Sequence, residues 1–138
     1  NAWGNAADYP IIASTYRVSE HWQTGAMTRN LPWLAELLPE MFVEISETLA
    51  AAKGIAGGDP VIVASARGEI RAKALVTKRM KPLYVNGRLV EQVGLPWHWG
   101  HQGIVTGERA NDLTPNVGDG NTHIPEYKVF LVDIRKAV

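Results

Sequence analysis

The chain has 138 residues and a mass of 15.1 kDa, the length of one domain, and its 46 % hydrophobic and 20 % charged residues are typical of a globular protein. Its 14 basic and 14 acidic residues give a formal net charge of zero, which argues against a general nucleic-acid binder. The absence of cysteine excludes disulfides, thiolate metal sites and a cysteine nucleophile, and no apolar run approaches the ~20 residues of a membrane-spanning helix.

The amino-terminal region is predicted to lead from a loose arm into a strand and a long loop. The chain starts at Asn1 with neither an initiator Met nor a signal peptide, which favours a mature or excised piece. Residues 1–8 are small and polar, and we expect them to precede one domain over residues 9–138. Tyr9–Thr15 is apolar and β-branched, which is typical of a strand, whereas Arg17–Thr28 shows no periodicity and is expected to be a loop.

Two short helices are predicted around a second strand. Asn30 is expected to cap a helix over Leu31–Leu38, followed by a strand over Met41–Ile45 in which apolar and polar residues alternate. Ser46 is expected to cap a second helix over residues 47–53. The first helix would have one apolar face, formed by Leu34, Leu37 and Leu38.

Hairpins are predicted in the second half of the chain. Val61–Ser65 and Ile70–Val76 read as two strands joined by a tight turn. Leu83–Val90 reads as a second hairpin, because the Asn86-Gly87 pair at its centre is a strong signal for a two-residue turn.

The end of the chain is expected to be irregular between Gly94 and Thr122 and to finish with a strand over Lys128–Ile134. Short strands, two short helices and two long loops favour a mainly β fold, a barrel whose openings the helices cover, over a β-sandwich. Long irregular loops in a compact domain are usually functional. The core is expected to contain Val43, Ile45, Val61, Val63, Ile70, Leu75, Val129, Leu131 and Val132.

The first loop, Thr15–Gly25, is a candidate ligand-binding segment. It combines hydroxyls, a guanidinium, a carboxylate, an imidazole, an indole and an amide within one short stretch. Such side chains suit the edges and faces of a large polar heterocycle. A solvated surface loop is the alternative interpretation.

The second loop contains two histidines between and beside two tryptophans. His98 and His101 have a spacing that would suit a metal, but no third histidine or paired carboxylate is close in sequence, and metal sites usually need three or four ligands. We therefore favour hydrogen-bonded histidines packed against tryptophan. Trp97 and Trp99 alternate, so one would face the core and the other a ligand.

Several cations flank these loops. Arg17, Arg29 and Lys128 would suit a diphosphate, with solvated loop charges as the alternative. No Walker loop, dinucleotide-fold glycine motif, nucleophile elbow or convincing acid–base pair occurs, so no catalytic residue is assigned. A basic run in the middle of the chain is either a solvated strand face or a docking surface for acidic partners; it comprises Arg67, Arg71, Lys73, Lys78, Arg79 and Lys81.

Taken together, these motifs resemble a known family. Thr15–Thr28 is similar to the cofactor-wrapping stretch in the C-terminal domain of the molybdopterin oxidoreductases, which include formate dehydrogenases and periplasmic nitrate reductases. The resemblance covers nearly the whole chain from Tyr9. The combination of Trp97-His98-Trp99-Gly100, Asn111–Pro115 and Val117-Gly118-Asp119 makes it most similar to the large subunit of periplasmic-type formate dehydrogenases. Segments that match the wider family are Gly58-Asp59, Ala66–Ile70, Asn111–Pro115, Gly118–Thr122 and Pro125–Lys128.

The resemblance implies a double-psi β-barrel, of the aspartate-decarboxylase type, that holds one or both molybdopterin guanine dinucleotides of a molybdenum or tungsten centre. The cofactor-binding residues that it implies are Thr15, Tyr16, Arg17, Val18, Ser19, Glu20, His21, Trp22, Gln23, Thr24, Gly25, Trp97, His98, Asn111, Tyr127 and Lys128.

The resemblance also implies what the chain does not supply. The family's selenocysteine or cysteine metal ligand, its catalytic histidine and arginine and its iron–sulfur cysteines have no counterpart in this sequence, so neither catalytic nor metal-ligating residues are expected in it. The implied partners are the remaining domains of a large subunit and an iron–sulfur electron-transfer subunit. A periplasmic location in anaerobic respiration is implied, without nucleic acid and without direct membrane insertion.

The expected function is therefore cofactor binding within an enzyme that oxidises formate to carbon dioxide. One alternative is the same domain of another member of the superfamily, such as a periplasmic nitrate reductase. Another is a non-catalytic β-barrel that serves as an interaction module. The motifs Glu20-His21-Trp22 and Tyr127-Lys128 favour cofactor binding, because an interaction barrel has no need of both.

Overall fold

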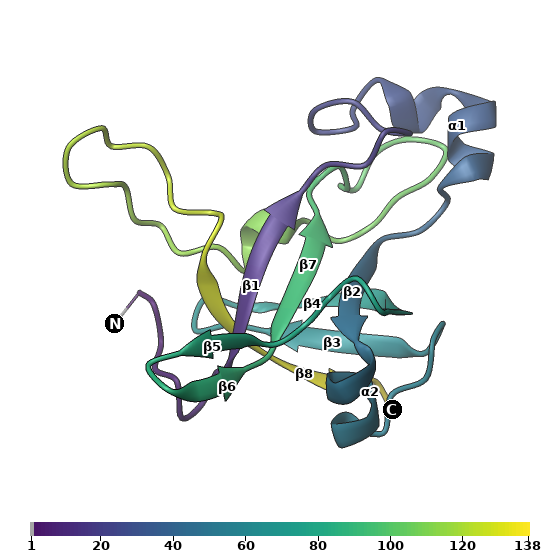
Figure 1. The fold of residues 1–138 in the computed structure, drawn as a ribbon. Helices are drawn as coiled ribbons and strands as arrows, with labels where there is room; N and C mark the ends of the chain where they lie inside the picture. The colour runs from purple at the N-terminus through teal and green to yellow at the C-terminus, as the bar shows by residue number, and fades with distance from the viewer. Residues whose placement is uncertain (1) are drawn as a thin grey trace.

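Six strands close into a barrel around which the rest of the chain is arranged (Figure 1). The computed structural model describes residues 2–138. The strand order is β1–β7–β2–β4–β3–β8, and the accompanying helices are short, which confirms the expected mainly β barrel. The barrel strands are β1 (Ile11–Tyr16), β2 (Phe42–Ser46), β3 (Pro60–Ala64), β4 (Glu69–Thr77), β7 (Gln92–Pro96) and β8 (Phe130–Lys136).

Both parallel and antiparallel pairs occur in the barrel. β1 pairs with β7 in parallel, and so does β2 with β4, whereas the other four pairings are antiparallel. In the first parallel pair Ile12 lies opposite Gln92 and Tyr16 opposite Pro96. The loops that follow β1 and β7 therefore leave the barrel at the same end, which places the two predicted functional loops together.

The prediction that Gly94–Thr122 is largely irregular is wrong at its start, because β7 continues through Pro96, and it holds for most of residues 97–122, where the named element is a short 3₁₀ turn. Glycine and proline are depleted in strands, which hid this element from the sequence analysis. Gly94 is needed there because the ring of Tyr16 lies against it. A Cβ at Gly94 would come within 2.5 Å of a carbon of that ring.

The core fills the barrel and agrees with the sequence at six of nine expected positions, all at most 2 % exposed: Val43, Ile45, Val61, Val63, Ile70 and Val132. The prediction is wrong for the other three, since Leu75 is 42 % exposed, Val129 is 58 % exposed and Leu131 is half-buried. Leu75 and Leu131 each lie one position out of phase with the inward side of their strand, and Val129 precedes β8. The inward residues of β4 and β8 are Ile70, Ala72, Ala74, Phe130, Val132 and Ile134.

The first helical region differs from the prediction at its start. A 3₁₀ turn, η1 (Thr28–Asn30), leads into α1 (Pro32–Leu37), and the N-cap is Leu31, with no side-chain hydrogen bond. Asn30 is therefore not the cap; its side-chain amide donates instead to a carbonyl of the preceding turn at 2.8 Å. The expected apolar face is only partly covered, because Leu37 is 68 % exposed.

The second helix forms as expected. In α2 (Glu47–Lys53) the Ser46 hydroxyl accepts the Leu49 N–H at 2.9 Å, and Gly54 ends the helix in a left-handed conformation. The strand before it does not alternate in burial as predicted, because even Glu44 is buried. No helix within residues 2–138 has the length and apolar character needed to cross a membrane.

The second predicted hairpin is confirmed and lies outside the barrel. It consists of β5 (Leu83–Val85) and β6 (Arg88–Val90), which form a separate two-stranded sheet. Asn86 and Gly87 have φ angles of 50° and 75°, as a tight hairpin turn requires. A second 3₁₀ turn, η2 (Ala110–Asp112), lies in the long loop before β8.

Candidate functional site

A cavity of about 800 Å³ opens where β1 and β7 end and β8 begins. Figure 1 shows the loops that follow β1 and β7 and the yellow-green loop that precedes β8 leaving the same end of the barrel. The cavity is therefore bounded by segments that lie far apart in sequence, as expected for a ligand site built by loops on a rigid barrel.

One wall joins the end of β1 to the start of β8. The Thr15 hydroxyl donates to the Tyr127 carbonyl at 2.9 Å, and the Thr15 N–H donates to the same carbonyl at 3.4 Å. The Lys128 ammonium donates to the Thr15 carbonyl at 2.5 Å and lies 5.4 Å from the Tyr127 ring. This wall thus presents an aromatic ring beside a cation that is itself exposed.

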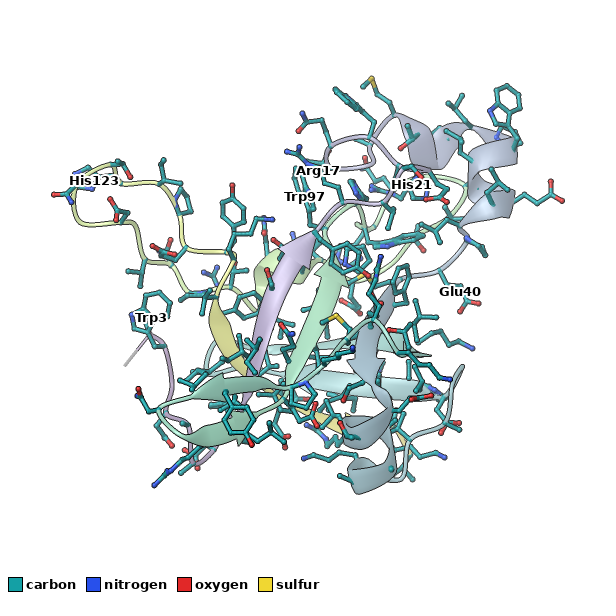
Figure 2. All side chains as sticks on the ribbon, viewed as in Figure 1. Trp3, Arg17, His21, Glu40, Trp97 and His123 are labelled. Atoms are coloured by element: carbon teal, nitrogen blue, oxygen red, sulfur yellow. The ribbon has the colours of Figure 1, made fainter. Side chains whose placement is uncertain are left out.

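A second wall is made by Arg17 and Trp97. The guanidinium of Arg17 lies over the Trp97 ring, 5.6 Å from its centroid, and Figure 2 shows the two side chains next to each other above β1. The backbone N–H of Trp97 donates to the Tyr16 carbonyl at 3.3 Å, which extends the pairing of β1 and β7 into the loops. A cation stacked on an indole offers both charge and a flat surface to a ligand.

The opposite wall is formed around η2. Ser65, at the end of β3, donates its hydroxyl to the Leu113 carbonyl at 2.8 Å, and Arg67 donates to the Thr114 carbonyl at 3.2 Å. The Thr114 hydroxyl donates to the Asn111 carbonyl at 3.2 Å. The β3–β4 turn therefore holds this loop in place, and it brings a third cation to the cavity.

The cavity includes seven of the residues predicted from the sequence: Thr15, Tyr16, Arg17, Trp97, Asn111, Tyr127 and Lys128. Sequence reasoning missed five others: Arg67, Thr114, Pro115, Asn116 and Pro125. Thr114 and Pro115 belong to the motif that begins at Asn111, so taking the whole motif would have found them. Arg67 was assigned to the basic run and to the matching segment Ala66–Ile70 but not to the site, although it lies in the turn between two barrel strands.

The rest of the first loop, Val18–Gly25, does not line the cavity. It turns away toward α1, and Figure 2 shows His21 on that side, beyond Arg17. His21 is 3 % exposed; its Nε2 donates to the Leu38 carbonyl at 3.1 Å, and its Nδ1 accepts from the Thr28 hydroxyl at 3.2 Å. The structure thus gives His21 an internal structural role.

His98 is fully buried behind the Arg17–Trp97 wall. Its Nε2 accepts the Val18 N–H at 3.0 Å, and its Nδ1 donates to the Gln23 carbonyl. The ring is therefore neutral with its proton on Nδ1. Burial lowers its pKa, and the charges of His21, Arg17 and Arg29 lower it further, against the raising effect of the Gln23 carbonyl. The favoured interpretation, a hydrogen-bonded histidine packed beside tryptophan, matches this geometry.

Arg29 also holds the Val18–Gly25 segment in place and is only 4 % exposed. Its guanidinium donates to three backbone carbonyls, those of Thr24 at 2.6 Å, His98 at 2.5 Å and Gln102 at 2.9 Å. Burial lowers the pKa of Arg29. The sequence suggested a phosphate partner for this cation, but its donors already join the first loop to the second.

A buried carboxylate lies just below the cavity. Glu44 is 1 % exposed and accepts hydrogen bonds from Tyr16 at 2.9 Å, Thr77 at 2.8 Å and Arg79 at 2.9 and 2.5 Å. Burial alone would raise the pKa of Glu44, but the hydrogen bonds from Arg79, Thr77 and Tyr16 outweigh burial and lower it. Burial, together with the bond to Glu44, raises the pKa of Tyr16. This network orients Tyr16 beneath the cavity.

The two histidines of the second loop are not a pair. His98 is buried, whereas His101 is exposed and lies with Glu108 and Asp112, their ligand atoms all within 4.8 Å of one another. Asp112 is already paired with Arg109 at 3.0 Å. Trp97 borders the cavity while Trp99 is 3 % exposed in the core, which is the division expected from their alternation.

Comparison with known proteins identifies the family. Residues 11–131 match the family described as the molydopterin dinucleotide binding domain. The chain belongs to this family. The matched segment includes five of the six barrel strands in full, the first two residues of β8, and both loops of the cavity.

The relatives of the chain are much longer proteins. It is 57 % identical over 130 residues to "Formate dehydrogenase subunit alpha" of Megalodesulfovibrio gigas, covering 94 % of this chain and 13 % of the relative. It is 56 % identical over 135 residues to "Formate dehydrogenase, nitrate-inducible, major subunit" of Escherichia coli K12, covering 97 % and 13 %. "Nitrate reductase" of Symbiobacterium thermophilum is 38 % identical over 131 residues, covering 95 % and 16 %.

The fold is also similar to that of a solved structure, "Acetylene Hydratase from Pelobacter acetylenicus". The TM-score is 0.76 at 14 % identity, and the match covers 96 % of this chain and 19 % of that one. At this identity the likeness concerns the fold alone. The formate dehydrogenase subunits named above are about eight times longer than the segment they share with this chain, so the chain spans about one eighth of the length of these curated relatives.

Proposed function

We propose that this chain binds molybdopterin guanine dinucleotide as the C-terminal domain of a formate dehydrogenase large subunit, an enzyme that oxidises formate to carbon dioxide. The observation that carries the proposal is the cavity itself, which brings Thr15–Arg17 of the first loop together with Trp97, Asn111 and Tyr127–Lys128. Formate dehydrogenase subunits are also the relatives of highest identity named above.

The donor set of the cavity fits a dinucleotide. Arg17, Arg67 and Lys128 place three cations around one space, as a diphosphate requires. The Tyr127 ring and the Arg17–Trp97 stack offer flat surfaces to heterocycles, and the amide side chain of Asn111 supplies donors and an acceptor for their edges. When bound, the cofactor supplies the molybdenum or tungsten ion through which electrons pass.

The residues of this chain bind and orient the cofactor and exclude water from it. No cysteine is present to ligate the metal, so the proposed protein ligand and the catalytic residues lie in other parts of the large subunit. The iron–sulfur ligands are proposed to lie there too. Hydrogen bonds from this domain to the pterin would tune the metal centre's potential.

The same proposal covers the organisation of the intact enzyme. Residues 1–8 would form an arm and residues 9–138 the binding domain, joined to the remaining domains of the large subunit. An iron–sulfur electron-transfer subunit is the proposed partner. The periplasm is the proposed location and anaerobic respiration the proposed setting.

The alternatives are less well supported. The nitrate reductase named above is 38 % identical, against 57 % for the formate dehydrogenase subunit. A non-catalytic interaction barrel would not require three cations around one cavity or the buried supports of its walls. The function of the whole protein is therefore best described as formate oxidation.

The test uses the full-length large subunit with Asn111→Ala and Lys128→Ala, each measured for metal and guanine nucleotide per polypeptide. Because a charge-assisted hydrogen bond contributes on the order of 1.5–3 kcal/mol, about a ten-fold or greater loss of cofactor affinity is expected for Lys128→Ala. The melting temperature of the cofactor-free protein should fall by less than about 4 °C. Arg71→Ala, at an exposed cation on β4, is the matched control. Full cofactor occupancy in both variants would contradict the proposal.

A further inference from the structure

The β5–β6 hairpin, residues 83–90 and here called the ribbon, stands apart from the barrel. In the described chain its strands pair only with each other, and the contacts of each strand are mainly with the other. A two-stranded ribbon is marginally stable in water unless another surface packs against it. The ribbon is therefore expected to be stabilised by packing against another surface.

Apolar side chains are exposed on both faces of the ribbon. Tyr84 lies opposite Leu89 on one face, and they are 81 % and 59 % exposed. Leu83 and Val85 lie on the other face and are 41 % and 40 % exposed. Contiguous exposed apolar residues of this kind mark interaction surfaces in soluble proteins.

The ribbon and the segment that leads to it, residues 78–82 and here called the strap, carry only positive charge. Lys78, Arg79, Lys81 and Arg88 are all exposed, and no carboxylate occurs between positions 78 and 90. Among the ion pairs of residues 2–138, Arg79 is the only member of this group that takes part. Two carboxylates lie nearby: Glu47 of α2 borders a groove of about 350 Å³ beside the strap, and Glu91, the residue after β6, accepts hydrogen bonds from the Ser46 and Thr48 hydroxyls. The surface is complementary to an acidic one.

The base of the ribbon is fixed. The side-chain amide of Gln92 donates to the Lys81 carbonyl at 2.7 Å, and the Arg79 guanidinium is bound to buried Glu44. The tight turn at Asn86-Gly87 fixes the tip. A partner would thus meet a preorganised arm, which lowers the entropic cost of docking.

The ribbon also lies away from the cavity. β6 leads directly into the first residues of β7, whereas the cavity residue Trp97 follows the last. Since β1 runs parallel to β7 and the cavity lies at their carboxyl ends, the ribbon joins the opposite end, as Figure 1 shows. A protein bound to the ribbon would leave the cofactor cavity open to the rest of the large subunit.

We propose that the ribbon is the docking arm for a second polypeptide, an accessory subunit that presents an acidic surface around an apolar groove. This inference rests on the proposed function, since it assumes that the chain works within a multi-subunit enzyme. The apolar pairs on both faces fit a groove that encloses the ribbon. The tip is Asn86-Gly87-Arg88, whose polarity opposes insertion into a lipid bilayer.

The first test measures the affinity of the purified full-length large subunit for the purified accessory subunit of the same enzyme. The double variants Tyr84→Ser/Leu89→Ser and Lys81→Glu/Arg88→Glu should each weaken binding by about ten-fold or more, and the affinity of the native protein should fall steeply with salt. Arg71→Glu changes an exposed cation on β4 and should stay within about two-fold of the native affinity. Native affinity in both double variants would overturn the proposal, as would greater binding to vesicles of phosphatidylserine and phosphatidylcholine than to the subunit.

The second test locates the contact by amide hydrogen exchange. Residues 83–90 should exchange fast in the isolated large subunit and at least about ten-fold more slowly in the assembled enzyme. Equal protection in the isolated large subunit would show that its own chain covers the ribbon, and fast exchange in both would show that nothing does; either result overturns the proposal. Cofactor content and dye-linked formate oxidation report separately on the proposed function and should be unchanged in the ribbon variants.

Discussion

The two halves of the Thr15–Gly25 loop differ in what their polar groups do. Thr15, Tyr16 and Arg17 border the cavity, and Arg17 is exposed there. The second half, from Val18 onward, is held by buried hydrogen bonds to His98, and Arg29 binds it at Thr24. In the first half Thr15 and Tyr16 are hydrogen-bonded within the fold, and the Arg17 guanidinium is the side-chain group left exposed at the cavity. The second half is held by hydrogen bonds within the fold.

This difference shows that a polar loop motif has two physical purposes. A buried donor or acceptor without a partner costs about 1–3 kcal/mol, so the anchored half must satisfy its groups internally. In the cavity half the Arg17 guanidinium stays accessible, and the proposed cofactor would be its partner. The two halves should therefore respond to substitution in opposite ways, one in stability and the other in ligand binding.

The largest effect is expected at Arg29. Arg29→Leu removes the donors to one buried and two partly buried carbonyls at once, so the free energy of unfolding should fall by about 3–5 kcal/mol. Chemical denaturation followed by tryptophan fluorescence measures this change. Arg71→Leu replaces an exposed arginine on β4 and serves as the control. If Arg29→Leu proved no more destabilising than this control, the anchored half would not depend on internal hydrogen bonds.

Substitutions at His98 should sharpen the comparison. His98→Leu leaves both the Val18 N–H and the Gln23 carbonyl unpaired and should cost about 2–4 kcal/mol of stability. His98→Gln can still accept from Val18, next to Arg17, whereas His98→Asn can still donate to Gln23. Both amide variants should be more stable than His98→Leu. In the full-length protein His98→Gln should retain more cofactor than His98→Leu or His98→Asn, measured as guanine nucleotide per polypeptide. If the Leu and Gln variants had equal cofactor content, the hydrogen bond from Val18 to His98 would not support the cavity wall.

The pH dependence of stability follows from His98. Its pKa is lowered in the folded state, so the unfolded state binds the proton more readily below the ordinary value of about 6.5. Stability is then complete above about pH 7 and falls as pH decreases through 6.5, by at most about 1.4 kcal/mol per pH unit. Denaturation curves between pH 7.5 and about 5 test this, with His98→Gln expected to show a shallower slope. An unchanged slope would assign the effect to other groups.

The smallest effect on stability is expected at Arg17. Arg17 is exposed and contacts Trp97 only through its stacked guanidinium, so Arg17→Ala should change the free energy of unfolding by less than about 1 kcal/mol. Cofactor retention by the full-length protein should nevertheless fall. A large stability loss without a loss of cofactor would reverse the roles assigned to the two halves.

Much of the fold was predictable because local signals were strong. The Asn86-Gly87 turn, the Ser46 cap and the apolar residues of β3 each specify local structure and form as predicted. β7 was missed because Gly94 is chosen for its contact with the Tyr16 ring, and no local pattern reveals a contact between distant residues. The inward phase of β4 and β8 was missed because Leu75 and Val129 are apolar but face outward.

The sequence located the loops that form the candidate site but not which of their side chains line the cavity. Sequence motifs located both loops, yet only the fold separates Arg17, at the cavity, from His21, which is buried in hydrogen bonds to Thr28 and Leu38. From the sequence Arg29 was expected to bind phosphate, but in the structure its guanidinium donates to the His98 carbonyl and so joins two loops of the chain. Burial of a polar side chain depends on long-range packing, which local composition does not encode.

The position of β8 links the order of folding to the making of the site. β8 pairs with both β1 and β3, so the ring stays open until residues 130–136 join it. Until then Tyr127 and Lys128 have no fixed place beside Thr15, and the cavity lacks a wall. The step that closes the barrel is therefore also the step that completes the proposed binding site, and a chain stalled before it would lack the wall formed by Tyr127 and Lys128.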